Sequence, residues 1–201
     1  MIKLNFKKGE EWYLEEEFEE IKEFRNTDFS TFLEEGQSDG CVGISVSEYL
    51  EEPQDFQQEA LNYFDNNQKK VLNALCQGVI DYYPKLMEIY DYMESTEDYF
   101  PKISTPADVK KIIGISHIEI LDDEKDGIGY IGFGCACPWD EEHGLGVIMH
   151  KDRVIDVGQY SYALSGTVEI RKDNGTYTEE ERIRTEVRVI EHKKKWWQFW
   201  K

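Results

Sequence analysis

Aromatic, carboxylate and imidazole side chains crowd into one short connection of this sequence, residues 139–146. Trp139 and Asp140 open it, and Glu142 and His143 follow. An imidazole titrates near neutral pH, and a neighbouring carboxylate can orient it as a general base. One hypothesis is therefore a metal-dependent hydrolase centred on Asp140, Glu142 and His143.

A metal site here would need further ligands. Cys135 and Cys137 stand two residues apart in an expected strand, so their side chains point to the same face. With His143 they make a weak candidate set, because zinc sites usually separate paired cysteines by two or more residues and require four ligands. G-x-S-x-G, H-E-x-x-H and a phosphate-binding glycine loop are all missing from the sequence. We therefore expect no cofactor and favour a protein without catalytic activity.

The same connection also has a purely structural interpretation, which we prefer. Trp139 packs beneath a sheet, and Asp140 caps a turn by accepting backbone N–H groups. Gly144 and Gly146 relieve a bend, and His143 bonds a nearby carboxylate or carbonyl. A loop that binds a partner protein is the other interpretation, with Trp139, Asp140, Glu142 and His143 as candidate binding residues.

The C-terminus is a second candidate site, because lysines surround a group of aromatic residues in a chain that is otherwise acidic: Lys193, Lys194, Lys195, Trp196, Trp197, Phe199, Trp200 and Lys201. Exposed tryptophans beside lysines suit an anionic membrane surface, to which each lysine contributes about 1 kcal/mol. Trp196, Trp197 and Trp200 are thus candidate binding residues for weak contact with a membrane. Alternatively, this tail folds back onto the acidic domain.

Composition limits the classes of partner. The 201 residues include 42 acidic and 23 basic ones, a net charge of −19, and 40% are hydrophobic, which predicts a folded globular protein. Such a charge repels a phosphate backbone, so we expect no nucleic acid, whereas a basic protein would be attracted. Acidity that only keeps the protein soluble is the alternative. Without an apolar leader, a disulfide framework or a membrane span in the sequence, we expect a cytoplasmic location.

Hydrophobic periodicity predicts the elements that position these residues. Strands are expected at 1–6, 41–47, 117–121, 128–137, 145–150 and 154–159, while residues 12–24 are ambiguous and are expected to begin as a strand and continue irregularly. Helices are expected at 55–63 and, after a break at 65–67, up to residue 83, where Pro84 disfavours continuation although residues 85–93 could add a turn or two. Thr105 and Pro106 are expected to cap and begin a third helix that runs to residue 113. Asn174-Gly175 predicts a hairpin between strands at 167–172 and 182–190. We expect an α+β fold, an antiparallel meander with the central helices on one face. The predicted division is 1–163 as the domain, 164–190 as a hairpin extension and 191–201 as the tail.

Residues of this connection also resemble the signature of a known protein family. Trp139-Asp140 and the run from Glu142 to Gly146, together with Tyr82-Tyr83-Pro84 upstream, resemble a bacterial family of unknown function that has a W-D-x-E-H-G-L-G signature. The similarity covers most of residues 1–160. Members resemble proteins encoded near toxin and secretion clusters, which implies an immunity-like binding role.

These observations together predict an acidic, non-catalytic binding protein of immunity-like type that occludes a partner protein, with a basic partner fitting best. The alternatives are the hydrolase centred on residues 140–143 and a peripheral membrane adaptor that uses residues 193–201.

Overall fold

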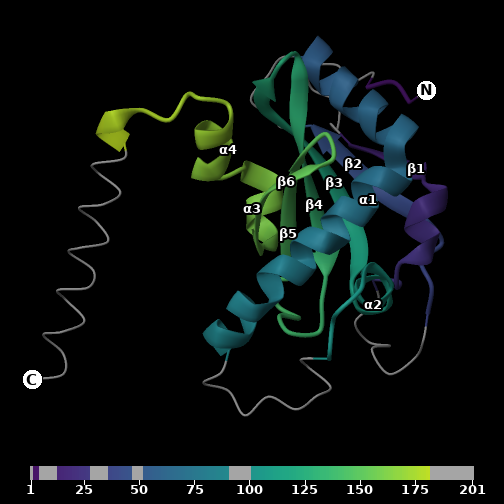
Figure 1. The fold of residues 1–201 in the computed structure, drawn as a ribbon. Coiled ribbons are helices and arrows are strands. Elements are labelled where there is room, and N and C mark those ends of the chain that lie inside the picture. Colours follow the sequence, from purple (N-terminus) through teal and green to yellow (C-terminus); the bar gives the residue numbers. More distant parts are fainter. Residues whose placement is uncertain (1, 5–12, 28–35, 47–51, 91–100, 182–201) are drawn as a thin grey trace, which may run out of the picture.

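The described part of the chain forms a six-stranded sheet with helices on both of its faces (Figure 1). The structure is a computed structural model and describes residues 2–4, 13–27, 36–46, 52–90 and 101–181. In the sheet the strands follow their order in the chain: β1 (Tyr13–Glu17), β2 (Cys41–Val46), β3 (Gly114–Lys125), β4 (Ile128–Ala136), β5 (Leu145–His150) and β6 (Arg153–Gln159). The helices are η1 (Glu19–Glu23, a 3-10 helix), α1 (Asp55–Tyr90), α2 (Pro106–Ile112), α3 (Tyr160–Ser165) and α4 (Val168–Asp173).

The α+β class is confirmed, but the purely antiparallel meander is wrong. Strands β3 to β6 do run antiparallel through short connections, as expected. Strand β2, however, pairs parallel to β3, with Ile44 opposite Ile118. A parallel pair requires a long crossover, and α1 with α2 supplies it between these two strands.

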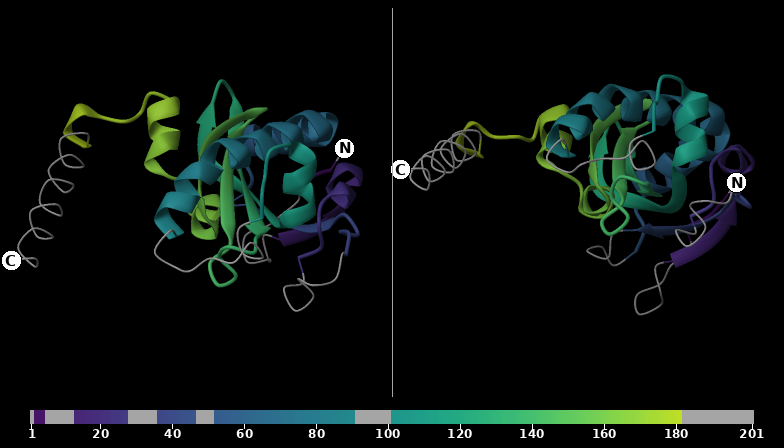
Figure 2. Two further views of the ribbon diagram at one scale, coloured as in Figure 1. Left: turned by 60° about the horizontal axis from the view of Figure 1, so that its bottom comes forward. Right: turned by 90° about the horizontal axis from the view of Figure 1, so that it is seen from below.

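Helix α1 covers one face of the sheet, where most of the core lies (Figure 2). Phe64 packs edge-on against Phe133 of β4, with ring centroids 5.3 Å apart. The two helices expected here form the two parts of α1, and they meet at a kink at Asn67, where the break was expected and where a φ of −133° is not helical. The side chain of Asn67 donates to the carbonyl of Tyr63 (2.8 Å), so the backbone at the kink keeps a partner. The helix also continues past Pro84 to Tyr90, although a proline disfavours continuation.

The predicted capped helix at 105–113 is confirmed as α2. Thr105 accepts the N–H of Asp108, and the Asp108 carboxylate accepts the N–H of Thr105, a complete capping box. The predicted strand at 1–6 is not seen in residues 2–4, and its remainder lies outside the described residues. Gln58 of α1 binds this segment instead, because its amide accepts from the Leu4 N–H and donates to the Ile2 carbonyl, both at 2.9 Å.

The face of the sheet opposite α1, the second face, has almost no side chains along one row of residues. Directly opposite one another on β2 to β6 stand five residues: Gly43, His117, Gly134, Gly146 and Gly158. Helix α3 lies against this face, so close that a Cβ on Gly146 would approach the backbone nitrogen of Ala163 to 3.0 Å. Helices α3 and α4, which we did not predict from the sequence, form a second layer, because the glycines let it reach the sheet.

The first strand of the expected C-terminal hairpin is also wrong, since residues 168–173 form helix α4. Thr167 begins this helix by accepting the Glu169 N–H. Ile170 is its buried residue and packs with Leu121, Tyr130 and Ile148 of the second face. The second strand, residues 182–190, and the basic tail lie outside the described residues, so the three-part division of the chain stays a prediction.

Candidate functional site

The connection between β4 and β5 folds around a buried tryptophan. Trp139 is only 6% exposed and packs edge-on against Tyr83 of α1, with ring centroids 5.5 Å apart. The indole is thus part of the core on the α1 side, as the structural interpretation predicts.

Asp140 closes the turn that follows. One of its carboxylate oxygens accepts the backbone N–H of His143 (2.9 Å) and also contacts His143 Nδ1 (3.0 Å). The Gly144 N–H donates to the Asp140 carbonyl (2.8 Å), and Gly144 has a φ of +62°, which favours glycine. The predicted capping role of Asp140 and the predicted bond from His143 are both confirmed.

This arrangement constrains the chemistry of the imidazole. An Nδ1–H that donates to Asp140 leaves Nε2 of the neutral ring as an acceptor, the orientation of a general base. The His143 side chain is nevertheless 56% exposed, so it lies in water rather than in an enclosed site. Glu142 is exposed as well.

The weak candidate metal ligands Cys135, Cys137 and His143 do not form a group in the described residues. Cys135 and Cys137 both face the core beneath α1, and Cys137 Sγ contacts the Asp140 carbonyl at 3.8 Å. Burial raises the pKa of Cys137 to about 12 and that of Cys135 well above its ordinary value, so both thiols stay protonated. In the described ranges no three His, Cys, Asp or Glu side chains are grouped as a metal site would need.

A cleft opens beside the indole. Its volume is about 220 Å³, and it lies between the end of α1, the connection and the junction of β6 with α3. Aromatic and aliphatic side chains dominate its walls, which are formed by Tyr82, Leu86, Trp139, Asp140, Gly144, Gly158, Gln159 and Tyr162. Small-molecule sites usually measure about 300–1,000 Å³. The cleft therefore suits a single large side chain better than a whole ligand.

A polar cluster that sequence reasoning missed lies on the second face. Ser45 Oγ is 2.7 Å from His117 Nε2 and donates a hydrogen bond to Glu119 Oε2, which is 3.3 Å from the same nitrogen. His117 and Glu119 share a face because they are two residues apart on β3. Ser45 joins them only through the parallel pairing of β2 with β3, which we had not predicted.

The geometry of this cluster differs from that of a catalytic triad. Ser45 and Glu119 both approach the same ring nitrogen of His117, Nε2. In a triad the carboxylate would bind Nδ1, and Nε2 would take the serine proton. Ser45 is therefore a bridge between two groups and not an activated nucleophile.

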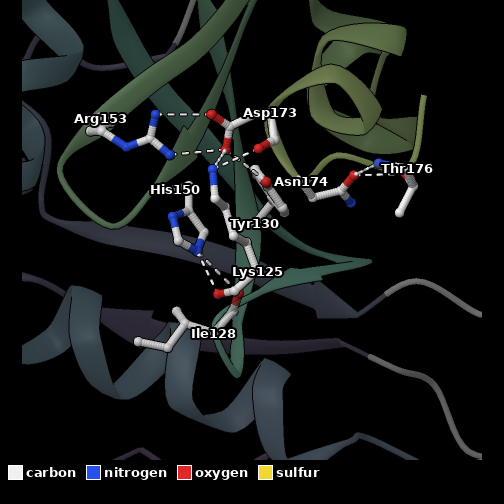
Figure 3. A network of polar contacts seen from close by, with 8 residues as sticks. All are labelled: Lys125, Ile128, Tyr130, His150, Arg153, Asp173, Asn174 and Thr176. Atoms are coloured by element: carbon white, nitrogen blue, oxygen red, sulfur yellow. Dashed lines mark hydrogen bonds and ion pairs between the residues drawn. The ribbon is translucent and has the colours of Figure 1, made fainter. Parts of the chain in front are cut away.

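A third cluster ties α4 to the sheet (Figure 3). The Asp173 carboxylate accepts two bonds from Arg153 (3.0 and 2.9 Å), one from Tyr130 Oη (2.8 Å) and one from Lys125 Nζ (3.2 Å). The Arg153 guanidinium is the largest of the influences that hold the pKa of Asp173 well below its usual range. His150 is buried beside Tyr130, and its Nε2 is within hydrogen-bond distance of the carbonyls of Lys125 and Ile128. We interpret this cluster as a structural clamp between α4 and the sheet.

The other predicted binding residues, Trp196, Trp197 and Trp200, lie outside the described residues together with Lys193 to Lys201, so contact of the tail with a membrane stays a prediction. Within the ranges that the structure describes, no helix is both long and apolar enough to cross a membrane.

Comparison with known proteins gives a family but no activity. Neither a curated protein nor a solved structure shows significant similarity to the chain. Residues 6–164, from before β1 through most of α3, match a family described as a domain of unknown function. The matched segment includes the Trp139 connection, the cleft and the Ser45 cluster, while α4 follows it. On this match the chain belongs to the family Domain of unknown function (DUF6985).

Proposed function

We propose that this protein is a non-catalytic, acidic binding protein that occludes a basic partner protein, in the manner of an immunity protein. The cleft beside Trp139 receives one large side chain of that partner. The net charge of −19 supports a basic partner, because opposite charge accelerates and orients the encounter.

One observation carries the proposal. Asp140 and His143 bind each other, while the indole of Trp139 lines an open cleft. Binding energy at protein interfaces concentrates in pockets lined by tryptophan, tyrosine and arginine. Tyr162, on the far wall of the cleft, is 40% exposed and is available for such a contact.

The experiment compares two neighbouring positions of α3. The protein is co-expressed with the products of the genes next to its own, and each complex is measured by isothermal titration calorimetry. Tyr162→Ala removes a cleft wall and is expected to weaken the complex about ten-fold or more. Leu164→Ala is the matched control, since Leu164 is 41% exposed on the same helix but does not line the cleft.

Two outcomes contradict the proposal: no neighbouring gene product forms a complex, or the two variants weaken the complex equally. Equal weakening would mean that general disturbance of α3 matters and the cleft does not.

A hydrolase is the second candidate, because the contact of Asp140 with His143 Nδ1 has the orientation of an acid–base pair. Elemental analysis of the untagged protein and of His143→Ala separates the two functions. Stoichiometric metal that is lost in the variant supports the hydrolase, and an unchanged trace level supports the binding protein.

A further inference from the structure

The second face of the sheet carries an exposed aromatic ring at its β1 end. Tyr13 is 47% exposed, and its ring lies flat on Gly43 of β2, where a Cβ would come within 2.4 Å of a ring carbon. The ring is also nearly parallel to the ring of His117, the residue beside Gly43 on β3, at 7° and with centroids 6.4 Å apart. Tyr13 is thus held in one orientation with part of its surface in solvent.

Negative charge gathers beside this ring. Glu15 is exposed on β1, and its Oε1 accepts from the Tyr13 hydroxyl (3.2 Å). The Glu119 side chain is only 9% exposed, and among the described residues its ion-pair partner is His117, not a lysine or an arginine. A carboxylate that is nearly buried without a permanent cation is expensive to desolvate. A cation from a partner molecule, bound next to Glu119, would lower the free-energy cost of burying this carboxylate.

The hydrogen-bond donors of this region are already used. The Ser45 hydroxyl donates to Glu119, the Tyr13 hydroxyl donates to Glu15, and His117 Nε2 is already hydrogen-bonded to Ser45. What is left is a set of acceptors: the carboxylate oxygens of Glu15 and Glu119 and the π face of Tyr13. A ligand that matches them must be rich in donors, positively charged and able to stack. A guanidinium, which is planar and has five N–H donors, meets all three requirements.

We propose that this region, formed by Tyr13, Glu15, Ser45, His117 and Glu119, binds an arginine side chain of a partner protein. The guanidinium stacks on Tyr13 and bonds Glu15, with the charge of Glu119 beneath it. The proposal takes the protein nature of the partner from the proposed function, but it does not depend on the cleft beside Trp139.

The test measures binding of a small peptide to the whole protein. The probe is the peptide acetyl-Gly-Arg-Gly-amide, titrated into the isotopically labelled protein and followed by NMR. The same peptide with citrulline in place of arginine is the ligand control, because citrulline keeps the shape and loses the charge. We expect the arginine peptide to shift the resonances of Tyr13 and His117, and the citrulline peptide to leave them in place.

Protein variants locate the contact. Glu119→Gln keeps the size of the side chain and is expected to weaken arginine-peptide binding about ten-fold. Tyr13→Leu, at an exposed position, removes the stacking surface and is expected to weaken binding without loss of fold. Glu17→Gln is the matched control: it removes one charge from the same face of β1, where the carboxylate is already paired with Lys22 (2.5 Å).

The proposal is overturned if the arginine peptide gives no shifts, if the citrulline peptide binds equally well, or if Glu17→Gln weakens binding as much as Glu119→Gln does. The last outcome would mean that only total charge matters. None of these results bears on the cleft, whose test uses a protein partner and Tyr162→Ala, so failure of one proposal is distinguishable from failure of the other.

Discussion

Individual carboxylates connect separate segments of this protein. Asp140 closes the loop after β4 by accepting from His143, three residues ahead of it. Asp173 acts over a longer range, because it binds Lys125 and Tyr130 of one hairpin and Arg153 of the next. In each case a charged acceptor satisfies several donors at once, which is among the stronger kinds of hydrogen bonding in proteins.

Asp173→Asn should show what this clamp contributes. We expect a loss of about 1–3 kcal/mol in unfolding free energy at pH 7, since the charged acceptor of three side chains is removed. The pKa of Asp173 in the folded state lies well below its usual value of about 3.9. Its stabilising effect is therefore complete above about pH 4 and is lost as the pH falls through the lower, folded-state pKa.

Urea unfolding of both proteins between pH 8 and acid conditions measures this difference. The gap should be constant near neutral pH and shrink below about pH 4. Asp126→Asn, at an exposed turn position with a φ of +54° that asparagine tolerates, is the control and should differ little from the parent at any pH. A gap for Asp173→Asn that persists unchanged into acid would show that the charge is not the source of the stability.

At the scale of elements, the glycines of the second face decide where α3 can lie. Gly132 and Gly134 of β4 lie beneath the backbone of Ala163 and the ring of Tyr160. A side chain at either position would separate helix and sheet, because protein interiors are close-packed and accommodate added atoms poorly. Since α3 forms one wall of the cleft through Tyr162, the glycine row also positions the proposed partner site.

Gly132→Ala should therefore destabilise the protein even though alanine suits a strand better than glycine does. The added Cβ would lie 1.9 Å from the Ala163 carbonyl oxygen, so α3 must move, at a cost of about 3 kcal/mol. Gly127→Ala is the matched control, because a Cβ there meets nothing within 4 Å and a φ of +73° alone costs about 1–2 kcal/mol. Thermal unfolding compares the two, and equal midpoints would mean that α3 does not rest on Gly132.

At the scale of the whole molecule, the excess of acidic residues sets the long-range field. The 42 acidic residues outnumber the 23 basic ones, so the net long-range interaction among the charges is repulsive. Ion pairs such as Lys70 with Asp152 (2.8 Å) are local exceptions. Self-repulsion of this kind keeps a protein soluble, attracts basic partners and opposes the compact state.

Salt should therefore raise the stability of this protein. Between ionic strengths of about 0.01 M and about 1 M the Debye length falls from about 30 Å to about 3 Å, which screens distant repulsion before it weakens contact ion pairs. We expect the midpoint of thermal unfolding in sodium chloride to rise by a few degrees over this range. A midpoint that falls would show that attractive pairs outweigh the net charge. Potassium chloride should reproduce the rise, because screening depends on ionic strength and not on the cation.

Local patterns in the sequence were sufficient for much of the fold. Alternation of apolar residues predicted β2 and the run of strands from β3 to β6, and Thr105 with Pro106 predicted the start of α2. The Asp140 cap could also be predicted, because its partners lie within four residues of it along the chain. In each of these cases the physical cause is contained in a short segment, so neighbouring residues suffice to determine it.

Tertiary structure decided the rest. Ser45 meets His117 across 72 residues of sequence, and only the parallel pairing of β2 with β3 brings them together. The placement of α3 and α4 on the second face likewise depends on glycines from four strands lying in one row, a register that no single segment contains. Pairing and register follow from the burial of a shared core, which is a property of all the strands at once. The sequence by itself thus determined the strands and the caps, and the packed sheet determined which side chains share a surface.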